Sequence, residues 1–560
     1  MIASPKRFPR AVWLWSIPLL FLGVFFFLPL GTVFHLAFQP EMGGVRVSRS
    51  DVLQPLGFTF WQAGLSTLLT LVVGLPAAYL FARFEFPGKR LLRVLTTLPF
   101  ILPTVVVAAS FNALLGPRGW INLLLMDWFG LATPPIQILN ILGAILLAHV
   151  FYNTTVVIRV VGSALGQLDP RLEQAARVLG ASPLRTLREV TLPLLRPALL
   201  SATLLVFLFD FTSFGVVLLL GGPRYATLEV EIYIQALQML NLPLAGLLSA
   251  VQLACTLAIS ALNSRLSGKR AVPLAPRLRG EGIRKPRTWR ERLLVGSLTA
   301  VLVALLVMPL AALGLRSVAR LEGARGERGA VQNGLTLDYY RELFINRRGS
   351  LFYVPPIEAA RNSLIYAGTT VVIALSLGSL AAAALSQRSK INRWLEPLLL
   401  LPLGASAVTL GLGFIVAFNK PPLDSRSFPL LVPIAHSLVA LPFVVRTLQP
   451  AMASIPQSLK QAAAVLGASP LRAWLEVDLP IIARAALVSA VFSFTISLGE
   501  FGATSFIAQT DMPTLPVAIY RFLSQPGGLN YGQAMAMATL LLVVCALGIL
   551  VIERLGGETF

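Results

Sequence analysis

Charged residues are scarce in this sequence, since only 13% of its 560 positions hold Asp, Glu, Lys or Arg. A soluble domain normally carries about a quarter charged residues, so the shortage excludes an ordinary soluble protein. Hydrophobic residues reach 56%, and apolar stretches long enough to cross roughly 30 Å of hydrocarbon recur along the chain. Every backbone polar group in lipid must be satisfied internally, so these stretches should be helices. The predicted fold class is an all-α polytopic membrane protein.

The sequence holds only two cysteines and three histidines, and it lacks a nucleotide-binding motif. Cys255 and Cys545 lie inside apolar stretches, which argues against a disulfide framework and a metal site. The three histidines form no acid–base or nucleophilic constellation, so an enzyme is not expected. The phosphate-cradling pattern G-x-x-x-x-G-K-[ST] does not occur. We therefore expect no metal and no cofactor in this chain, and any ATP must be bound by a partner.

Acidic residues are outnumbered, 25 against 46 basic ones, which gives a net charge of +21. The basic residues cluster in short segments between apolar stretches, as the positive-inside rule predicts for cytoplasmic loops. No nucleic-acid partner is therefore expected. The segment from Arg316 to Arg361 is predicted to lie outside although it holds eight arginines. Long loops cross a membrane with little regard for their charge.

About twelve membrane spans are predicted, with both termini in the cytoplasm. The first follows Lys6, Arg7 and Arg10 and lacks an A-x-A-like cleavage site, so it is interpreted as an uncleaved anchor. The predicted spans are 11–34, 58–82, 94–115, 139–163, 198–220, 242–263, 293–315, 362–386, 395–417, 429–449, 485–508 and 533–553. The predicted divisions are an anchor helix with an outer loop (1–57), a first transmembrane domain (58–263), a basic cytoplasmic linker (264–292), a seventh span with an outer loop (293–357), and a second transmembrane domain (358–553).

An internal repeat relates the two halves. QAARVLGASPLRTLREVTLP begins at Gln174 and QAAAVLGASPLRAWLEVDLP begins at Gln461, an offset of 461 − 174 = 287. Each half holds six predicted spans, an even number, so the copies enter the membrane in the same orientation. Parallel repeats of this kind favour a pathway between the halves. The same offset pairs His149 with His436, Arg159 with Arg446, Phe214 with Phe501, and Tyr233 with Tyr520.

The repeated segment follows the fourth span of each half, on the predicted cytoplasmic side. Gly180 should end one amphipathic helix, and Ser182 followed by Pro183 predicts an N-cap and a first-turn proline for the next. That short helix carries an apolar stripe and should end at Pro193. A short apolar-faced helix on this side can insert into a groove of a partner.

These segments resemble the EAA loop of type I binding-protein-dependent ABC importer permeases. The family pattern is E-A-A, three residues, a glycine, and later an apolar-x-Leu-Pro end; both copies match except that glutamine replaces glutamate. Glutamine cannot form the salt bridge of that glutamate but can still hydrogen-bond. The resemblance implies that the helix after each glycine docks into an ATPase. The implied coupling residues are Gln174, Ala175, Ala176, Gly180, Leu184, Leu187, Gln461, Ala462, Ala463, Gly467, Leu471 and Trp474.

The resemblance also implies partners. They are two copies of a cytoplasmic ABC ATPase, which bind ATP and magnesium, and an extracytoplasmic substrate-binding protein; one copy of this chain should serve each complex in the inner membrane. Loop residues Arg224, Glu229, Glu231 and Asp511 are candidate contacts or ordinary solvated positions. The fused form resembles ferric-iron and thiamine permeases, so either substrate is expected. A secondary transporter built from parallel repeats is the alternative, but it gives no reason for the repeated loop.

Two acids lie inside predicted spans, Asp210 in the fifth and Glu500 in the eleventh. Glu500 corresponds to Ser213, one helical turn from Asp210, so both acids could share a face of equivalent helices. They could line a pathway for a cation, or else pair with a basic group or cap a broken helix. His149 and His436 could bind a metal, but internally satisfied structural histidines are favoured over that role.

Overall fold

The computed structural model describes residues 8–38, 48–268, 283–321, 334–346, 354–387, 391–424 and 428–556. Within these ranges the chain is almost entirely helical, with one antiparallel pair of two-residue strands. Lys6, Arg7 and residues 269–282 of the predicted linker lie outside the described residues.

Most elements of both halves are α-helices, and shorter π-helical or 3₁₀ turns join some of them. The first half contains α1 (Phe8–Leu22), α2 (Leu28–Ala37), α3 (Arg49–Arg83), α4 (Lys89–Ile101), α5 (Thr104–Leu115), α6 (Trp120–Phe129), α7 (Leu142–Gln167), α8 (Pro170–Val178), α9 (Pro183–Thr186), α10 (Leu192–Phe211), α11 (Leu228–Tyr233) and α12 (Leu242–Gly268). The second half contains α13 (Trp289–Leu306), α14 (Met308–Ser317), β1 (Ala319–Arg320), β2 (Gly334–Leu335), α15 (Asp338–Arg341), α16 (Pro356–Leu385), α17 (Asn392–Leu400), α18 (Ala407–Ala417), α19 (Leu431–Ala453), α20 (Gln457–Val465), α21 (Pro470–Ala473), α22 (Leu479–Gly499), α23 (Thr504–Ile507), α24 (Leu515–Leu523) and α25 (Gly528–Gly556). The π-helical turns are η1 (Gly23–Phe27), η2 (Leu187–Thr191), η3 (Val217–Gly221), η5 (Ile234–Gln238) and η8 (Trp474–Asp478), and the 3₁₀ turns are η4 (Pro223–Tyr225), η6 (Glu342–Phe344) and η7 (Leu401–Leu403).

Ten helices of the described chain are long and apolar enough to cross a membrane, and two bent pairs bring the number to as many as twelve. The predicted all-α polytopic class is confirmed. The predicted third span is not straight: α4 and α5 meet at 115°. Leu102 is extended between them, as expected for a residue before a proline, and Pro103 precedes the first turn of α5. The predicted ninth span is likewise bent, by 94°, before α18.

The prediction that Pro193 ends a separate short helix is wrong. Helix continues from Pro183 to Phe211 through the π turn η2. The N–H of Leu192 bonds to the carbonyl of Leu187, five residues back, and Pro193, which has no N–H to donate, lies directly after this wider turn at the start of α10. The equivalent turn η8 precedes α22 in the second half.

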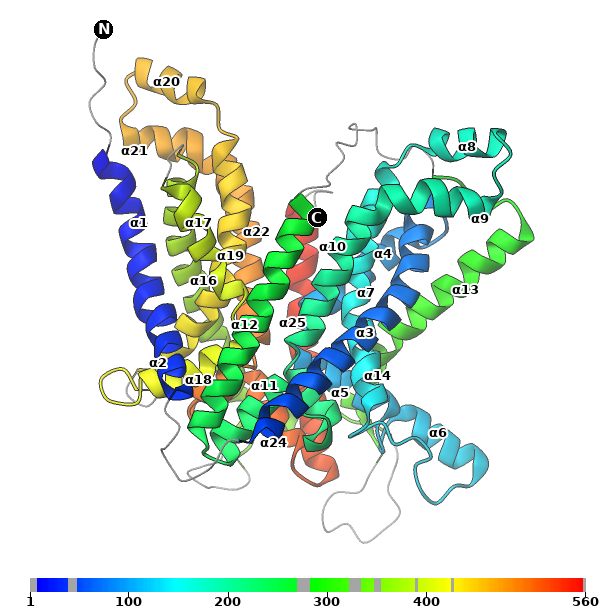
Figure 1. Cartoon of the computed structure of the whole chain (residues 1–560). Coiled ribbons are helices and arrows are strands. Elements are labelled where there is room, and N and C mark those ends of the chain that lie inside the picture. The colour runs from blue at the N-terminus through cyan, green and yellow to red at the C-terminus, as the bar shows by residue number, and fades with distance from the viewer. Residues whose placement is uncertain are drawn as a thin grey trace.

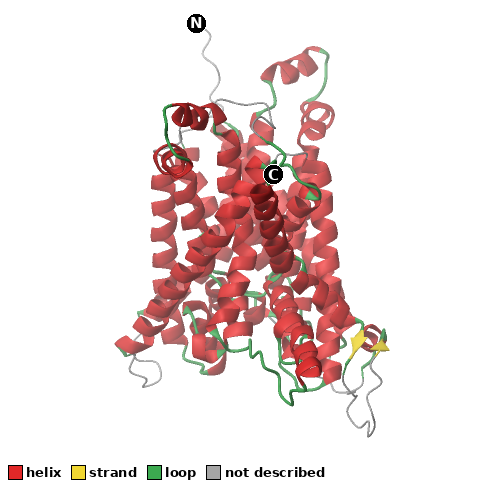
Figure 2. Cartoon of the chain, turned by 90° about the vertical axis from the view of Figure 1, so that its right-hand side faces the viewer, coloured by secondary structure: helices red, strands yellow, loops and turns green. Residues whose placement is uncertain are grey.

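The two repeats run in the same direction, as predicted. The hairpins α8–α9 and α20–α21 lie at one end of the molecule, called the hairpin end below, where α1 also begins and α25 ends (Figures 1 and 2). The helices form two arms, one that carries the hairpin α8–α9 and one that carries α20–α21 (Figure 1). The arms stand apart at the hairpin end and converge at the opposite end, called the converging end below (Figure 1). Helix α6 and the strands lie at the converging end (Figures 1 and 2).

The first span of each half packs against the other half. Helix α1 contacts α16, while α13 contacts α3 and α4. The indole N–H of Trp15 in α1 donates to Asn392 Oδ1 at 3.2 Å, and that of Trp120 donates to the carbonyl of Ala312 at 3.2 Å. Each arm is therefore completed by a helix from the other repeat.

The second and fourth spans of each half pack closely at a glycine of the second span. A Cβ added to Gly74 in α3 would lie 2.7 Å from the Cβ of Val157 in α7. In the second half, a Cβ on Gly378 of α16 would meet Val444 of α19, the repeat equivalent of Val157. Small residues let helix backbones approach where apolar burial gives no driving force in lipid.

We expect Gly74→Ala and Gly378→Ala each to destabilise the protein by about 1–3 kcal/mol, because the added methyl overpacks a rigid contact. The thermal unfolding midpoint in detergent measures the effect. Gly64→Ala and Gly368→Ala, on the same two helices, are matched controls because a Cβ there meets no atom within 4 Å. The controls should be neutral or stabilising by up to about 1 kcal/mol through helix propensity. Equal loss in all four variants would contradict the packing argument.

Candidate functional site

The first hairpin turns at a left-handed glycine. Gly180 has φ +86°, and the N–H of Ala181 bonds to the carbonyl of Ala176 at 3.0 Å, which closes the C-terminus of α8. Ser182 Oγ then accepts from the N–H of Arg185 at 3.3 Å. The predicted helix end, N-cap and first-turn proline are confirmed here.

The second hairpin repeats this geometry. Gly467 has φ +80°, and the N–H of Ala468 bonds to the carbonyl of Ala463 at 2.9 Å. Ser469 Oγ accepts from the N–H of Arg472 at 3.3 Å. Two copies of one local structure, 287 residues apart in sequence, thus occupy the same end of the molecule.

Both hairpins expose apolar side chains that a folded core would bury. Leu179 and Leu184 are 88% and 75% exposed, and their counterparts Leu466 and Leu471 are 86% and 68% exposed. Contiguous exposed apolar surface of this kind marks an interaction site. Further exposed members are Val178, Leu187, Val465 and Trp474. Gln174, Ala175, Gln461 and Ala462 are also exposed, whereas Ala176 and Ala463 are half-buried.

The first hairpin is fixed to the end of the second span by an ion pair. Arg83 Nη2 at the end of α3 lies 2.9 Å from Glu173 Oε1 in α8, and the hydroxyl of Thr191 donates to the same oxygen at 3.0 Å. Sequence reasoning passed over Glu173, which directly precedes Gln174. Displacement of this hairpin would therefore pull on α3.

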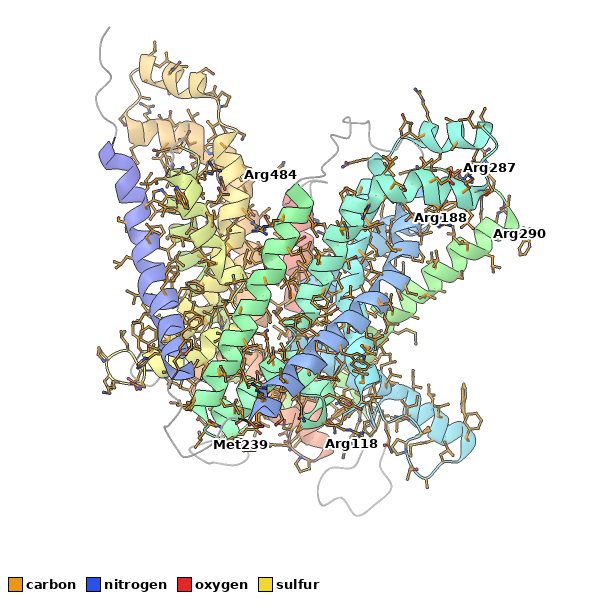
Figure 3. The ribbon with its side chains drawn as sticks, in the orientation of Figure 1. Arg118, Arg188, Met239, Arg287, Arg290 and Arg484 are labelled. Atoms are coloured by element: carbon orange, nitrogen blue, oxygen red, sulfur yellow. The ribbon has the colours of Figure 1, made fainter. Side chains whose placement is uncertain are left out.

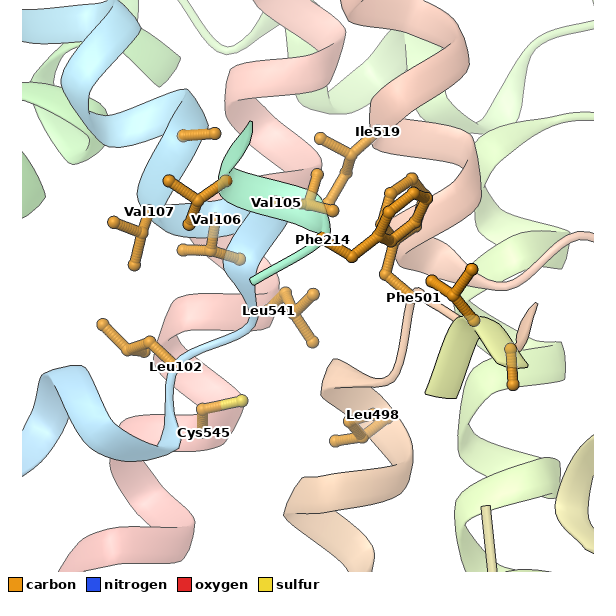
Figure 4. Packing of buried hydrophobic residues seen from close by; sticks show 14 of the residues in the cluster. Leu102, Val105, Val106, Val107, Phe214, Leu498, Phe501, Ile519, Leu541 and Cys545 are labelled. Atoms are coloured by element: carbon orange, nitrogen blue, oxygen red, sulfur yellow. The ribbon is translucent and has the colours of Figure 1, made fainter. Parts of the chain in front are cut away.

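An aromatic cluster joins the halves near the converging end. The rings of Phe214 and Phe501, equivalent by the repeat, stack with centroids 5.6 Å apart and planes 21° apart (Figure 4). Tyr233 packs on Phe214 at 5.4 Å, and its equivalent Tyr520 packs on Phe501 at 5.5 Å. Phe506 adds an edge contact to Tyr233. These five residues, called the aromatic gate below, form one of the contacts between the two halves.

The gate phenylalanines stand where spans five and eleven break. Helix α10 ends at Phe211 and α22 ends at Gly499, just before Phe214 and Phe501. A Cβ on Gly215 would collide with Thr104 at the start of α5 and lie 3.3 Å from Phe501. The glycine after the first gate ring thus lets broken segments from both halves meet.

The two acids of spans five and eleven are buried beside histidines. Asp210 is fully buried, with Oδ1 3.3 Å from Nδ1 of His149, and Glu500 is 8% exposed, with Oε2 3.2 Å from Nε2 of His436. Ser213 Oγ lies 2.8 Å from His149 Nε2. Glu500 also accepts backbone N–H bonds at the start of α23, so it caps a broken helix. The spacing of His149 and Asp210 along the chain gave no signal of this pairing.

No group of three or more His, Cys, Asp or Glu side chains placed to hold a metal occurs among the described residues. Of the loop candidates, Glu229 is 2% exposed and accepts from Gln252 Nε2 at 3.1 Å. The expectation of a surface contact at Glu229 is therefore wrong, because its carboxylate is held inside the protein. Arg224 and Asp511 are exposed and Glu231 is half-buried.

Two parallel helical repeats, twin exposed hairpins and a central contact between broken spans define a polytopic membrane permease. The chain belongs to the family described as "Binding-protein-dependent transport system inner membrane component", whose pattern matches residues 70–267 and again 374–555. It is the membrane-spanning permease subunit of an ATP-binding-cassette importer, with the two permease repeats fused in one polypeptide.

Curated relatives match almost the whole chain. The thiamine transport system permease protein ThiP of Escherichia coli K12 is 28% identical, over 90% of this chain and 88% of that protein. ThiP of Brucella abortus (strain 2308) is 29% identical over 89% and 86%. A probable ABC transporter permease of Sinorhizobium fredii, y4fN, is 27% identical over 90% and 87%. Among solved structures, a bacterial ABC transporter involved in alginate import matches with a TM-score of 0.40 and 18% identity, over 47% of this chain and 96% of that one.

Gly180→Val should open the turn of the first hairpin, because a left-handed conformation costs an ordinary residue about 1–2 kcal/mol. We expect the amide of Ala181 to exchange its hydrogen roughly tenfold faster, as the bond to Ala176 loosens. Hydrogen–deuterium exchange mass spectrometry measures this. Gly180→Asn should lie nearer the parent protein, and Gly166→Ala, in the helical part of α7 with open space around it, should leave the hairpin unchanged. Unaltered exchange in the valine variant would show that the turn does not need glycine.

Proposed function

We propose that this chain imports thiamine, which a binding protein delivers from outside and which two copies of a separate ABC ATPase drive inward. The observation that carries this proposal is the pair of equivalent hairpins. Each one presents exposed leucines at the same end of the molecule, beside a turn of identical geometry. Two equal docking surfaces fit two identical partners, and both ATP and magnesium would be bound by those partners.

Docking would use the hairpin leucines as anchors. Leu184 and Leu471 are equivalent, exposed and presented by short helices after rigid glycine turns. Apolar anchors of this kind dock a helix by its apolar face into a hydrophobic groove of a partner. Gln174 and Gln461 lie exposed on the same hairpins and are available for hydrogen bonds to the ATPase. The continuous helix from Pro183 to Phe211 would pass hairpin movement to the fifth span.

The hairpin end is assigned to the cytoplasm. Arg188, Arg287 and Arg290 gather there (Figure 3), in line with the excess of basic residues on the cytoplasmic side of membrane proteins. Because α1 begins and α25 ends at the same end (Figures 1 and 2), both termini are assigned to the cytoplasm. Arg224 and Asp511, exposed outside the spans, then remain available to a binding protein.

The conformation fits a pathway closed on the outer side. The arms diverge toward the hairpins (Figure 1), while the Phe214–Phe501 stack joins the halves beside the tyrosines of α11 and α24, helices that lie toward the other end (Figure 1). Substrate entry would require these two rings to separate. Closure of the ATPase pair on the hairpins is the movement that would drive the exchange of access between the two sides.

Thiamine is favoured as the substrate because permeases named for it match this chain across almost its full length. Ferric iron is the competing substrate. The buried acids do not separate the two, since in this conformation they face histidines inside the protein.

Leu184→Asp combined with Leu471→Asp should weaken binding of the ATPase roughly tenfold or more, because two apolar anchors that docking would bury become charged. Co-purification of the tagged permease with its ATPase measures the binding. Leu335→Asp is the control, since Leu335 is also an exposed leucine but lies on β2 at the far end (Figure 2). Undiminished ATPase recovery with the double variant would reject the hairpins as the docking site.

Deletion of this chain should abolish ATP-dependent uptake of labelled thiamine, and restoration of the intact chain should return it. Labelled ferric iron is measured in parallel. If uptake of iron and not of thiamine follows the chain, the substrate assignment is wrong while the importer assignment stands. If uptake persists after removal of the ATPase, the transporter is not driven by ATP, as the secondary-transporter alternative requires.

A further inference from the structure

His149 and His436 occupy the same place in the two repeats. Each lies in a fourth span, α7 or α19, and is 2% exposed or less. One nitrogen of each ring faces the last turn of the gate-carrying span, at Asp210 or Ser497. The other nitrogen faces a residue just beyond that helix, Ser213 or Glu500. The histidines thus connect the fourth span to the break that carries the gate phenylalanine.

In the first half the carboxylate stands on the Nδ1 side of the ring. Asp210 Oδ1 is 3.3 Å from His149 Nδ1, and Ser66 Oγ of α3 is 2.9 Å from the same nitrogen. The hydroxyl of Ser213 is 2.8 Å from Nε2. Asn153 Nδ2 donates to Asp210 Oδ1 at 2.7 Å, so the acid is held from the fourth span as well.

In the second half the carboxylate stands on the Nε2 side. Glu500 Oε2 is 3.2 Å from His436 Nε2, and the hydroxyl of Thr504 is 2.8 Å from it. The hydroxyl of Ser497 is 2.7 Å from Nδ1. Thr370 of α16, 3.2 Å from Ser497, reaches this side from the second span, as Ser66 does in the first half.

Acid and hydroxyl have therefore exchanged places between the repeats. The 287-residue offset makes Asp210 equivalent to Ser497, and Ser213 equivalent to Glu500. His149 contacts an acid at the first of these positions and a serine at the second. His436 contacts a serine at the first position and an acid at the second. Because both orders occur in one protein, the imidazole accepts a carboxylate on either side with a serine hydroxyl on the other.

The second of these positions directly precedes the gate. Phe214 follows Ser213, and Phe501 follows Glu500. Whatever holds Ser213 or Glu500 to the imidazole also sets where the adjacent ring stands in the stack between the halves. Buried polar contacts of this kind are strengthened by the low local dielectric and help to fix one arrangement of the chain.

We propose that His149 and His436 are positioning residues of the aromatic gate, and that the acid and hydroxyl beside each are interchangeable between its two sides. The imidazole ties the broken end of the gate-carrying span to the fourth span of its own half, so that the gate ring moves with that half as one body. Asp210 and Glu500 then serve the histidines and not a cation in the pathway. This inference rests on the proposed transport function for its uptake readout only.

The test transplants the arrangement of the second half into the first. Asp210→Ser removes the acid beside His149 and should lower uptake roughly tenfold, because a buried polar partner is lost. Adding Ser213→Glu restores one acid and one hydroxyl in the order of the second half, and should return uptake to within roughly threefold of the parent. With His149→Ala also present, the double change should give no rescue.

Gate position is measured without reference to any substrate. Phe214→Cys with Phe501→Cys, in an assembled complex whose Cys255 and Cys545 are changed to Ala, should be linked readily by a short bifunctional thiol reagent, since the two rings they replace stack with centroids 5.6 Å apart. Asp210→Ser should lower the crosslinking rate several-fold and the added Ser213→Glu should restore it. This readout holds even if the chain carries ferric iron or another substrate.

A purely structural role would change the yield of folded complex but neither the crosslinking rate nor its rescue. The proposal is overturned if Asp210→Ser leaves both uptake and crosslinking unchanged. It is also overturned if the double variant accumulates and assembles normally yet performs no better than Asp210→Ser. Should the double variant fail to accumulate, the reciprocal pair Ser497→Asp with Glu500→Ser decides the question in the second half, with the same two readouts.

Discussion

The satisfaction of backbone polar groups in hydrocarbon is the constraint on which the rest of this structure depends. A helix can break at membrane depth only where protein covers the freed N–H and C=O groups. The breaks found in this chain meet one another: Gly499, at the end of α22, lies beside Pro103 between α4 and α5, and Gly215 lies against Thr104. The interface between the halves is where the chain can leave regular helix, and the gate is built there.

Much of the architecture could be predicted from the sequence because it depends on local signals. Apolar length gave the spans, and the glycine, serine and proline of each hairpin gave its turn and cap. The bent third span and the continuation of helix through Pro193 could not be predicted in this way. The continuation through Pro193 depends on which carbonyl accepts a bond in the folded protein, and a π turn such as η2 has no reliable signature in composition. Pro103 marks a local break in the third span, but it does not show that the two helices meet at 115°.

The candidate site likewise has one part that could be predicted from the sequence and one part that could not. The hairpin residues were predicted because a repeated motif marks them, and the structure places them together and exposed. The pairing of Asp210 with His149 joins residues 61 positions apart on different helices, so only the folded chain brings them together. The repeat did contain part of this information, because His149 is equivalent to His436 and Ser213 is equivalent to Glu500. What it did not give was the direction in which each side chain points.

The crossing of α1 and α13 into opposite arms has a consequence for how such a chain arises and assembles. The segment that was duplicated is not the segment that folds as a body, because each arm borrows its outermost helix from the other copy. In a single repeat expressed alone, the first helix would lack the helices of the other repeat against which it packs. The remaining helices would have one side exposed to lipid. Fusion guarantees that each copy finds its counterpart at a ratio of one to one. The covalent link between the repeats therefore fixes their stoichiometry at the level of the gene.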